Sequence, residues 1–175
     1  MVLILARAQA KYCIRRTANK SDYNYKFWKI HMAKVSVIKT IAAPAAKVWK
    51  MVSNWGGTHD WIPGVGPVTV SGTDVGATRS AELDPATGFP GLITESLDAF
   101  DEPDMYFRYS IVGDSPIPIK NYVAEMRVTE LAGESCEVLW QSEWNAAGEI
   151  SEDELLEAFN GLYQMALDNV QSACE

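Results

Sequence analysis

The sequence predicts an α+β domain in which a curved antiparallel sheet of seven strands packs against one long C-terminal helix. Two observations carry this prediction. Seven short segments alternate apolar and polar side chains and are divided by turn-forming residues, which is the pattern of a meandering sheet. A much longer C-terminal segment repeats apolar residues every three or four positions, which is the pattern of an amphipathic helix.

The first predicted strand and two short helices open the domain. Residues 34–41 alternate and are rich in β-branched side chains, which favours a strand. Pro44 suits the first turn of a helix, and the apolar stripe that follows it reaches Val52 before residues 54–57 end the helix. A second, shorter helical turn is predicted over residues 58–61.

Six further strands make up the middle of the chain. Clusters of Gly, Pro, Asn, Asp and Ser separate them, and such clusters mark turns. The predicted strands cover residues 68–71, 77–83, 92–100, 105–112, 121–131 and 136–145. Their even spacing indicates antiparallel neighbours joined by hairpins.

The C-terminal helix has a clear start. Ser151 and Glu154 match an S-x-x-E capping box, in which each side chain satisfies a backbone N–H of the first turn. A helix from about residue 152 to 173 would be roughly 33 Å long and would cross a whole sheet. Its apolar stripe consists of Leu155, Phe159, Leu162, Tyr163, Ala166, Leu167 and Val170.

Charge is unevenly distributed along the 175 residues, whose formal net charge is −8. Residues 1–31 carry seven Lys or Arg side chains and a single acid, Asp22, whereas the rest carry eight basic and 22 acidic side chains. This acidic body argues against a nucleic-acid partner, which a basic surface would bind. No apolar run reaches the roughly 18–20 residues that cross a bilayer, so we expect a soluble protein without a membrane span.

The basic N-terminal extension, residues 1–31, has three interpretations. Its Arg-rich, acid-poor composition is typical of an organelle transit peptide. Alternatively, the natural start is Met32, and the preceding residues come from upstream codons. In the third interpretation the extension is an ordered part of the protein. Residues 32–175 are then a single domain, which we expect in the cytoplasm unless the extension directs it to an organelle.

Few side chains are available for metal or nucleophilic chemistry. Cys13, Cys136 and Cys174 are scattered and form no C-x-x-C pair, which indicates a reducing compartment without structural disulfides. The two histidines, His31 and His59, are too few for a zinc site, so no metal and no cofactor are predicted. The sequence does not indicate an oligomeric state.

Strand alternation assigns an inward-facing set of side chains, because neighbouring residues of a strand point to opposite faces. The set is strongly aromatic. Buried Tyr and Trp need hydrogen-bond partners, so several of them in one interior indicate an apolar cavity with a few polar groups; a filled core is the alternative. The predicted ligand-binding residues are Trp61, Arg79, Glu95, Phe107, Tyr109, Tyr122, Met126, Trp140, Trp144, Phe159 and Tyr163.

Two charged residues share this inward face on consecutive strands. Arg79 and Glu95 are expected to form an ion pair, because an unpaired charge inside the sheet would be very costly. The pair is either a structural salt bridge or a polar anchor for a ligand, in which case it could also serve as a general acid and base. The candidate catalytic residues are therefore Arg79, Glu95 and His59, the last of which titrates near neutral pH.

The mouth of the cavity is predicted at residues 54–67 and 114–120, which combine glycines and prolines in loops. Gly161 lies in the interior of the C-terminal helix, where glycine costs about 1 kcal/mol relative to alanine. Close packing of the helix on the sheet would explain it, and so would space for a ligand.

The order of elements carries a family resemblance. The segments are VIKTIAAPAAKVWKMVSNW, GATRS, ITESLDAFD, YFRYSIVGDSPIPIKNYVAEMRVTE, CEVLWQSEW and EDELLEAFNGLYQMALDNV. From about residue 34 to 172 the chain resembles the START-like SRPBCC superfamily, and within it the polyketide cyclase/dehydrase-like branch. The resemblance implies a helix-grip fold with a cavity between the sheet and the last helix. It also implies an Arg and a Glu at the places of Arg79 and Glu95.

Two functions fit these features. The leading hypothesis is a protein that binds a hydrophobic or aromatic small molecule of polyketide, lipid or isoprenoid type. The alternative is an enzyme of the polyketide cyclase/dehydratase type, in which acid and base residues in the cavity move protons. A third possibility, an interaction module, requires the cavity to be filled by side chains.

Overall fold

The computed structural model describes residues 32–175. The basic N-terminal extension, with Cys13, lies outside the described residues, so the three interpretations of that extension concern residues that the structure does not describe.

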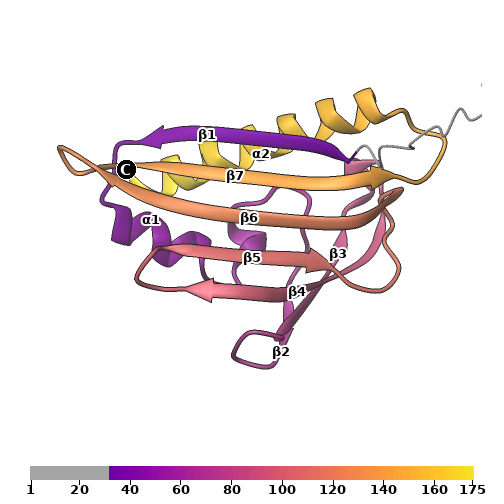
Figure 1. Cartoon of the computed structure of the whole chain (residues 1–175), viewed down its shortest axis with the longest axis horizontal. Coiled ribbons are helices and arrows are strands. Elements are labelled where there is room, and N and C mark those ends of the chain that lie inside the picture. The colour runs from indigo at the N-terminus through magenta and orange to yellow at the C-terminus, as the bar shows by residue number, and fades with distance from the viewer. Residues whose placement is uncertain (1–31) are drawn as a thin grey trace, which may run out of the picture. The chain divides into compact units, whose positions relative to one another are not determined.

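A seven-stranded antiparallel sheet forms the body of the domain, as predicted (Figure 1). Its strand order is β1-β7-β6-β5-β4-β3-β2, so the first two strands lie at opposite edges. The strands are β1 (Ala33–Ile41), β2 (Thr69–Ser71), β3 (Thr78–Leu83), β4 (Gly91–Asp101), β5 (Tyr106–Ile111), β6 (Ile119–Leu131) and β7 (Ser135–Ala146).

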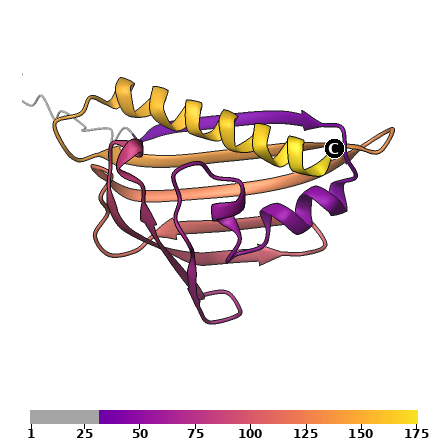
Figure 2. The ribbon, with the colours of Figure 1, turned by 180° about the vertical axis from the view of Figure 1, so that it is seen from behind.

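Two irregularities bend the sheet. The register shifts between Leu97 and Ala99 in β4, and again between Lys120 and Val123 in β6. Such bulges insert unpaired backbone and increase local twist and bending. The curvature gives the sheet a concave side, on which the helices lie (Figure 2).

Helix α2 (Glu152–Cys174) runs along this concave side beside β1 and β7, as both views show (Figures 1 and 2). The predicted capping box is present: Ser151 Oγ accepts the backbone N–H of Glu154 at 3.3 Å, and Glu154 Oε2 accepts that of Ser151 at 3.0 Å. The capped helix begins at the residue that the sequence predicts. It is 23 residues long, and within residues 32–175 no helix is long and apolar enough to cross a membrane.

The second half of α2 is tied to the rest of the domain. Lys47 Nζ donates to the carbonyl of Cys174 at 2.6 Å, and Lys39 forms an ion pair with Asp168. Asn169 Nδ2 donates to the Trp61 carbonyl at 3.0 Å. Between residues 155–165 of the helix and the other described elements, the only side-chain hydrogen bonds or ion pairs are those of Tyr163. This first half of α2 is the part that faces a cavity.

Three short helices complete the fold. Helix α1 (Ala45–Val52) and the 3-10 helix η1 (Thr58–Asp60) lie between β1 and β2, as predicted. A further 3-10 helix, η2 (Pro85–Thr87), was not predicted, and it connects β3 to β4. Its local signal is Asp84, whose side chain accepts the backbone N–H of Ala86 at 2.7 Å and caps the turn.

Candidate functional site

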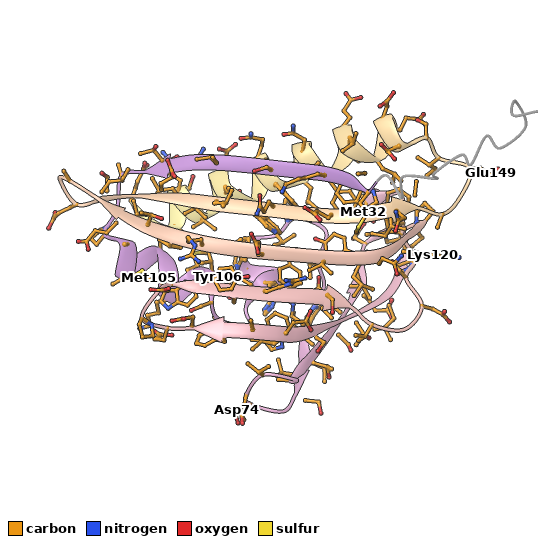
Figure 3. The ribbon with its side chains drawn as sticks, viewed as in Figure 1. Met32, Asp74, Met105, Tyr106, Lys120 and Glu149 are labelled. Carbon is orange, nitrogen blue, oxygen red and sulfur yellow. The ribbon has the colours of Figure 1, made fainter. Side chains whose placement is uncertain are left out.

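A cavity of about 470 Å³ lies between the concave face of the sheet and the first half of α2. This volume falls within the range of small-molecule sites, roughly 300–1,000 Å³. The cavity lies toward the end of the sheet marked by Lys120 and Glu149, away from the β4–β5 turn at Met105 (Figure 3). Most of the lining side chains are apolar, which suits an apolar occupant.

The predicted ion pair of Arg79 and Glu95 is part of the cavity wall. Arg79 in β3 is directly opposite Glu95 in β4, and Arg79 Nε lies 2.6 Å from Glu95 Oε2. The two side chains are 6% and 16% exposed. In-register placement on antiparallel strands brings the charges together, because opposite residues lie about 4.5–5.5 Å apart at their β-carbons.

Two aromatic rings hold the guanidinium of Arg79 in place. Its central carbon lies 3.8 Å from the centre of the Trp55 ring and 4.9 Å from that of Tyr109. Stacking on aromatic faces is worth about 1–2 kcal/mol where the cation is desolvated. These rings and Glu95 therefore fix the orientation of the cation.

Arg79 keeps hydrogen-bonding capacity that the described residues do not use. Within residues 32–175 its one hydrogen-bond partner is Glu95, through Nε. The terminal amino groups have no partner among these residues, and they are not fully buried. The Arg79 side chain lines the cavity, so its unused donors belong to a residue of the cavity wall. These donors are available to an oxygen atom in the cavity.

Phenol and indole groups supply the other polar contacts. The hydroxyl groups of Tyr122 and Tyr163 lie 2.7 Å apart, and Tyr163 donates to Ser142 Oγ at 2.7 Å. Trp140 Nε1 donates to the Tyr109 hydroxyl at 3.0 Å. Burial raises the pKa of Tyr109, Tyr122 and Tyr163 well above the usual value, so all three phenols are neutral hydrogen-bond donors near pH 7.

The three buried phenols make the fold sensitive to alkali. Each ionises near pH 10.0 in the unfolded chain but stays protonated to higher pH in the folded one. Their stabilisation is therefore complete below about pH 10 and is lost as the pH rises, by about 1.4 kcal/mol per pH unit for each phenol. We expect urea unfolding at several pH values to show this slope.

The variant Tyr163→Phe is expected to reduce the alkaline slope, because it removes one of the buried phenols whose pKa is raised in the folded protein. The phenolate ultraviolet absorbance of these buried phenols should appear together with unfolding. Ionisation of all the tyrosines while the protein is still folded would contradict the buried network.

The structure brings most of the predicted ligand-binding residues to the cavity. The lining residues from the sheet each come from a different strand and lie on the inward face that alternation predicts, and the other two come from α2. Those that line the cavity are Arg79, Glu95, Tyr109, Tyr122, Trp140, Phe159 and Tyr163.

Four predicted residues are buried but do not line the cavity. Phe107 and Met126 lie farther along their strands, where the Phe107 ring packs 6.0 Å from Trp49 of α1. Trp144 is covered by Phe159, with ring centres 4.5 Å apart, and Trp61 packs edge-on against Trp140. Alternation identifies the face of a strand, whereas the helix above each position decides whether space remains there.

His59, the third candidate catalytic residue, lies away from the cavity lining. Its side chain is 40% exposed, and Nε2 is 3.4 Å from the Asp60 carboxylate. The same 3-10 helix instead directs Thr58 toward the cavity. A single histidine in a loop carries no sequence signal for the direction of its ring.

Several lining residues were missed by the sequence. Trp55 lies in one of the predicted mouth segments and does not line the cavity, and nothing in the sequence indicates its contact with Arg79. Of the two predicted mouth segments, Thr58, residues 62–65 and Ile117 line the cavity. Other missed residues lie on β3, β4 and β5, in η2 and the β3–β4 connection, and on one face of α2. They are Ala81, Leu83, Ile93, Ile111, Ala86, Thr87, Phe89, Leu155, Glu157, Ala158, Gly161, Leu162 and Met165.

Comparisons with known proteins agree with this architecture. A family model described as polyketide cyclase / dehydrase and lipid transport matches residues 32–175. Among curated proteins no sequence matches the chain.

Solved structures share the fold. The protein XoxI from Bacillus cereus is 25% identical with a TM-score of 0.72, and the match covers 82% of this chain and 96% of that one. The Zhui aromatase/cyclase from a Streptomyces species is 23% identical with a TM-score of 0.64, covering 82% and 92%. Norcoclaurine synthase from Thalictrum flavum, in complex with dopamine and hydroxybenzaldehyde, is 17% identical with a TM-score of 0.65, covering 82% and 86%.

Proposed function

Because the chain belongs to the polyketide cyclase/dehydrase and lipid transport family, we propose that it binds a hydrophobic or aromatic small molecule of polyketide, lipid or isoprenoid type. The observation that carries this proposal is the cavity of about 470 Å³ with apolar walls and a single cross-strand ion pair. A filled core would have left no such space, so an interaction module without a ligand is disfavoured. Burial of apolar ligand surface would supply most of the affinity.

The polar groups of the wall indicate how the ligand would be oriented. An oxygen atom of the ligand, as a carbonyl, hydroxyl or carboxylate, would accept hydrogen bonds from the terminal amino groups of Arg79. Tyr109 stands beside Arg79, and its oxygen already accepts the indole N–H of Trp140. The apolar part of the ligand would then lie against Ile93, Ile111 and Leu162, which line the same cavity.

A second candidate function is an enzyme of the cyclase/dehydratase type, and the placement of Arg79, Glu95 and Tyr109 on one cavity wall favours it. Glu95 would remove a proton from a carbon next to a carbonyl group, and Arg79 would stabilise the oxyanion that forms. The neutral phenol of Tyr109 would protonate the departing hydroxyl group, so that a C–H and a C–O bond break, a C=C bond forms and water leaves. The proton on Glu95 would then restore the phenol.

Native mass spectrometry of the purified protein, followed by organic extraction, tests the binding function. We expect a small molecule to co-purify, or the empty protein to bind anilinonaphthalene sulfonate saturably. The absence of both would overturn the proposal, since an apolar cavity of this size should bind an apolar fluorophore.

The variant Glu95→Gln separates the binding protein from the enzyme. If the protein only binds its ligand, wild type and variant carry a molecule of the same mass. In the dehydratase, the wild type carries product and the variant accumulates a molecule heavier by one water, because the base is missing. The variant Glu143→Gln, which changes an exposed carboxylate on β7, is the matched control and should behave like the wild type.

A further inference from the structure

Helix α2 contains one glycine, Gly161, that neither backbone strain nor packing explains. A β-carbon placed on Gly161 would meet no atom within 4 Å apart from its chain neighbours and the nearby backbone of its own helix, and its backbone is not in the left-handed region. Close packing of the helix on the sheet, one of the two explanations offered by the sequence, is therefore wrong for this residue. Glycine in a helix interior costs about 1 kcal/mol relative to alanine, and no contact offsets that cost.

The exposed part of the cavity lining lies mostly beside Gly161, so we place the opening of the cavity there. Five lining residues are solvent-exposed, and four of them lie within about two turns of α2. These exposed lining residues are Ala86, Glu157, Ala158, Gly161 and Met165. Ala158 and Gly161 are three positions apart and share one side of the helix, so their minimal side chains leave a notch between the flanking turns.

The opposite rim of the opening is held in place by backbone contacts. The N–H of Gly66 donates to the Glu82 carbonyl at 2.9 Å, and the N–H of Asp84 donates to the Gly64 carbonyl at 2.9 Å. A β-carbon on Gly64 would lie 2.4 Å from Thr87 Cγ2, so the two loops are in close contact. Because this rim is fixed on β3, the side chains of α2 set the width of the opening.

A polar group inside the cavity independently indicates an occupant. Arg79 is 5% exposed and lines the cavity, and its terminal amino groups have no hydrogen-bond partner among the described residues. Arg79 and Glu95 belong to the sheet wall, whereas the notch belongs to the helix wall. A ligand whose oxygen contacts Arg79 would extend its apolar end toward Gly161.

We propose that the notch at Ala158 and Gly161 is the passage through which the ligand enters, and that the apolar end of a bound ligand lies in it. The ligand class that fits is an elongated amphipathic molecule with one polar end, rather than a compact ring system that the cavity encloses. Met165, 52% exposed beside the notch, offers a flexible apolar surface for the protruding end. This inference rests on the proposed binding function and names the shape of the ligand and the residue that limits it.

The test compares Gly161→Leu with Gln164→Leu, an exposed position of the same helix that does not line the cavity. Two fluorescent probes are used: anilinonaphthalene sulfonate, which is compact, and cis-parinaric acid, which is elongated. We expect Gly161→Leu to weaken cis-parinaric acid about tenfold, equivalent to about 1.4 kcal/mol. The Gln164→Leu variant should bind both probes like the wild type.

Stability provides a second readout of the same variant. Gly161→Leu should raise the melting temperature, because leucine is a strong helix former and meets open space. A lower melting temperature, or unchanged binding of the elongated probe, would overturn the notch as a passage. Binding of the compact probe alone by the wild type would overturn the elongated ligand class. Binding of neither probe by the wild type would overturn the binding function itself.

Discussion

Arg79→Leu is expected to lower the free energy of unfolding by about 3 kcal/mol, because it leaves the carboxylate of Glu95 inside the domain without its partner. The Arg79 side chain is 6% exposed, so bulk water screens the pair poorly. The variant also removes the cation stacked on Trp55. Urea denaturation measures the loss.

The double variant Arg79→Leu with Glu95→Leu distinguishes the two roles that the sequence left open for this pair. Replacing a buried ion pair with apolar side chains often restores stability. We therefore expect the double variant to recover most of the lost stability but not the binding of anilinonaphthalene sulfonate, whose sulfonate group needs the cation. Recovery of both would show that the pair is a structural salt bridge.

An exposed cross-strand pair provides the matched control. Lys34 and Glu143 face each other in register on β1 and β7, with side chains about half exposed. Lys34→Leu should change the free energy of unfolding by less than about 1 kcal/mol, because exposed ion pairs contribute little. An equal loss in Arg79→Leu and Lys34→Leu would contradict the burial of the Arg79 pair.

Trp144→Ala is expected to have the largest effect on stability, a loss of about 4 kcal/mol. The side chain is fully buried, and its ring packs against Phe159 and Tyr122. Truncation to alanine leaves a void beneath α2 that the sheet and helix cannot close without moving. Chemical denaturation of the variant measures the loss, and Leu92→Ala, at a position 55% exposed, is the control that should change stability little.

A milder variant at the same position tests the packing more finely. The indole nitrogen of Trp144 has no hydrogen-bond partner among residues 32–175. Trp144→Phe therefore loses volume but no hydrogen bond, and it should cost clearly less than Trp144→Ala. Equal costs for the two variants would show that ring packing does not determine stability here.

The ion pair of the candidate site was predictable from local sequence. Arg79 and Glu95 each interrupt an inward-facing series, and a short hairpin connection makes their strands antiparallel neighbours. Cross-strand register then follows from the period of two, because a slip of either strand by one residue would turn its inward series outward. The capping box at Ser151 and Glu154 fixes the start of α2 in the same local way.

The interior of the cavity was only partly predictable. Phe107 and Tyr109 share one face of β5, yet only Tyr109 lines the cavity, because α1 places Trp49 against the ring of Phe107. No periodicity in β5 distinguishes the two residues. The distinction depends on how far α1 extends over the sheet, which is a contact between segments that are distant in sequence.

The sequence by itself determined the α+β fold, the order of its elements, the inward faces of the strands and the pairing of Arg79 with Glu95. These features follow from backbone periods and turn chemistry, which act over a few residues. The tertiary structure alone decided which inward side chains border empty space, and that Gly161 is among the residues that line it. A void is what remains when separate elements pack, so its position depends on all of them at once.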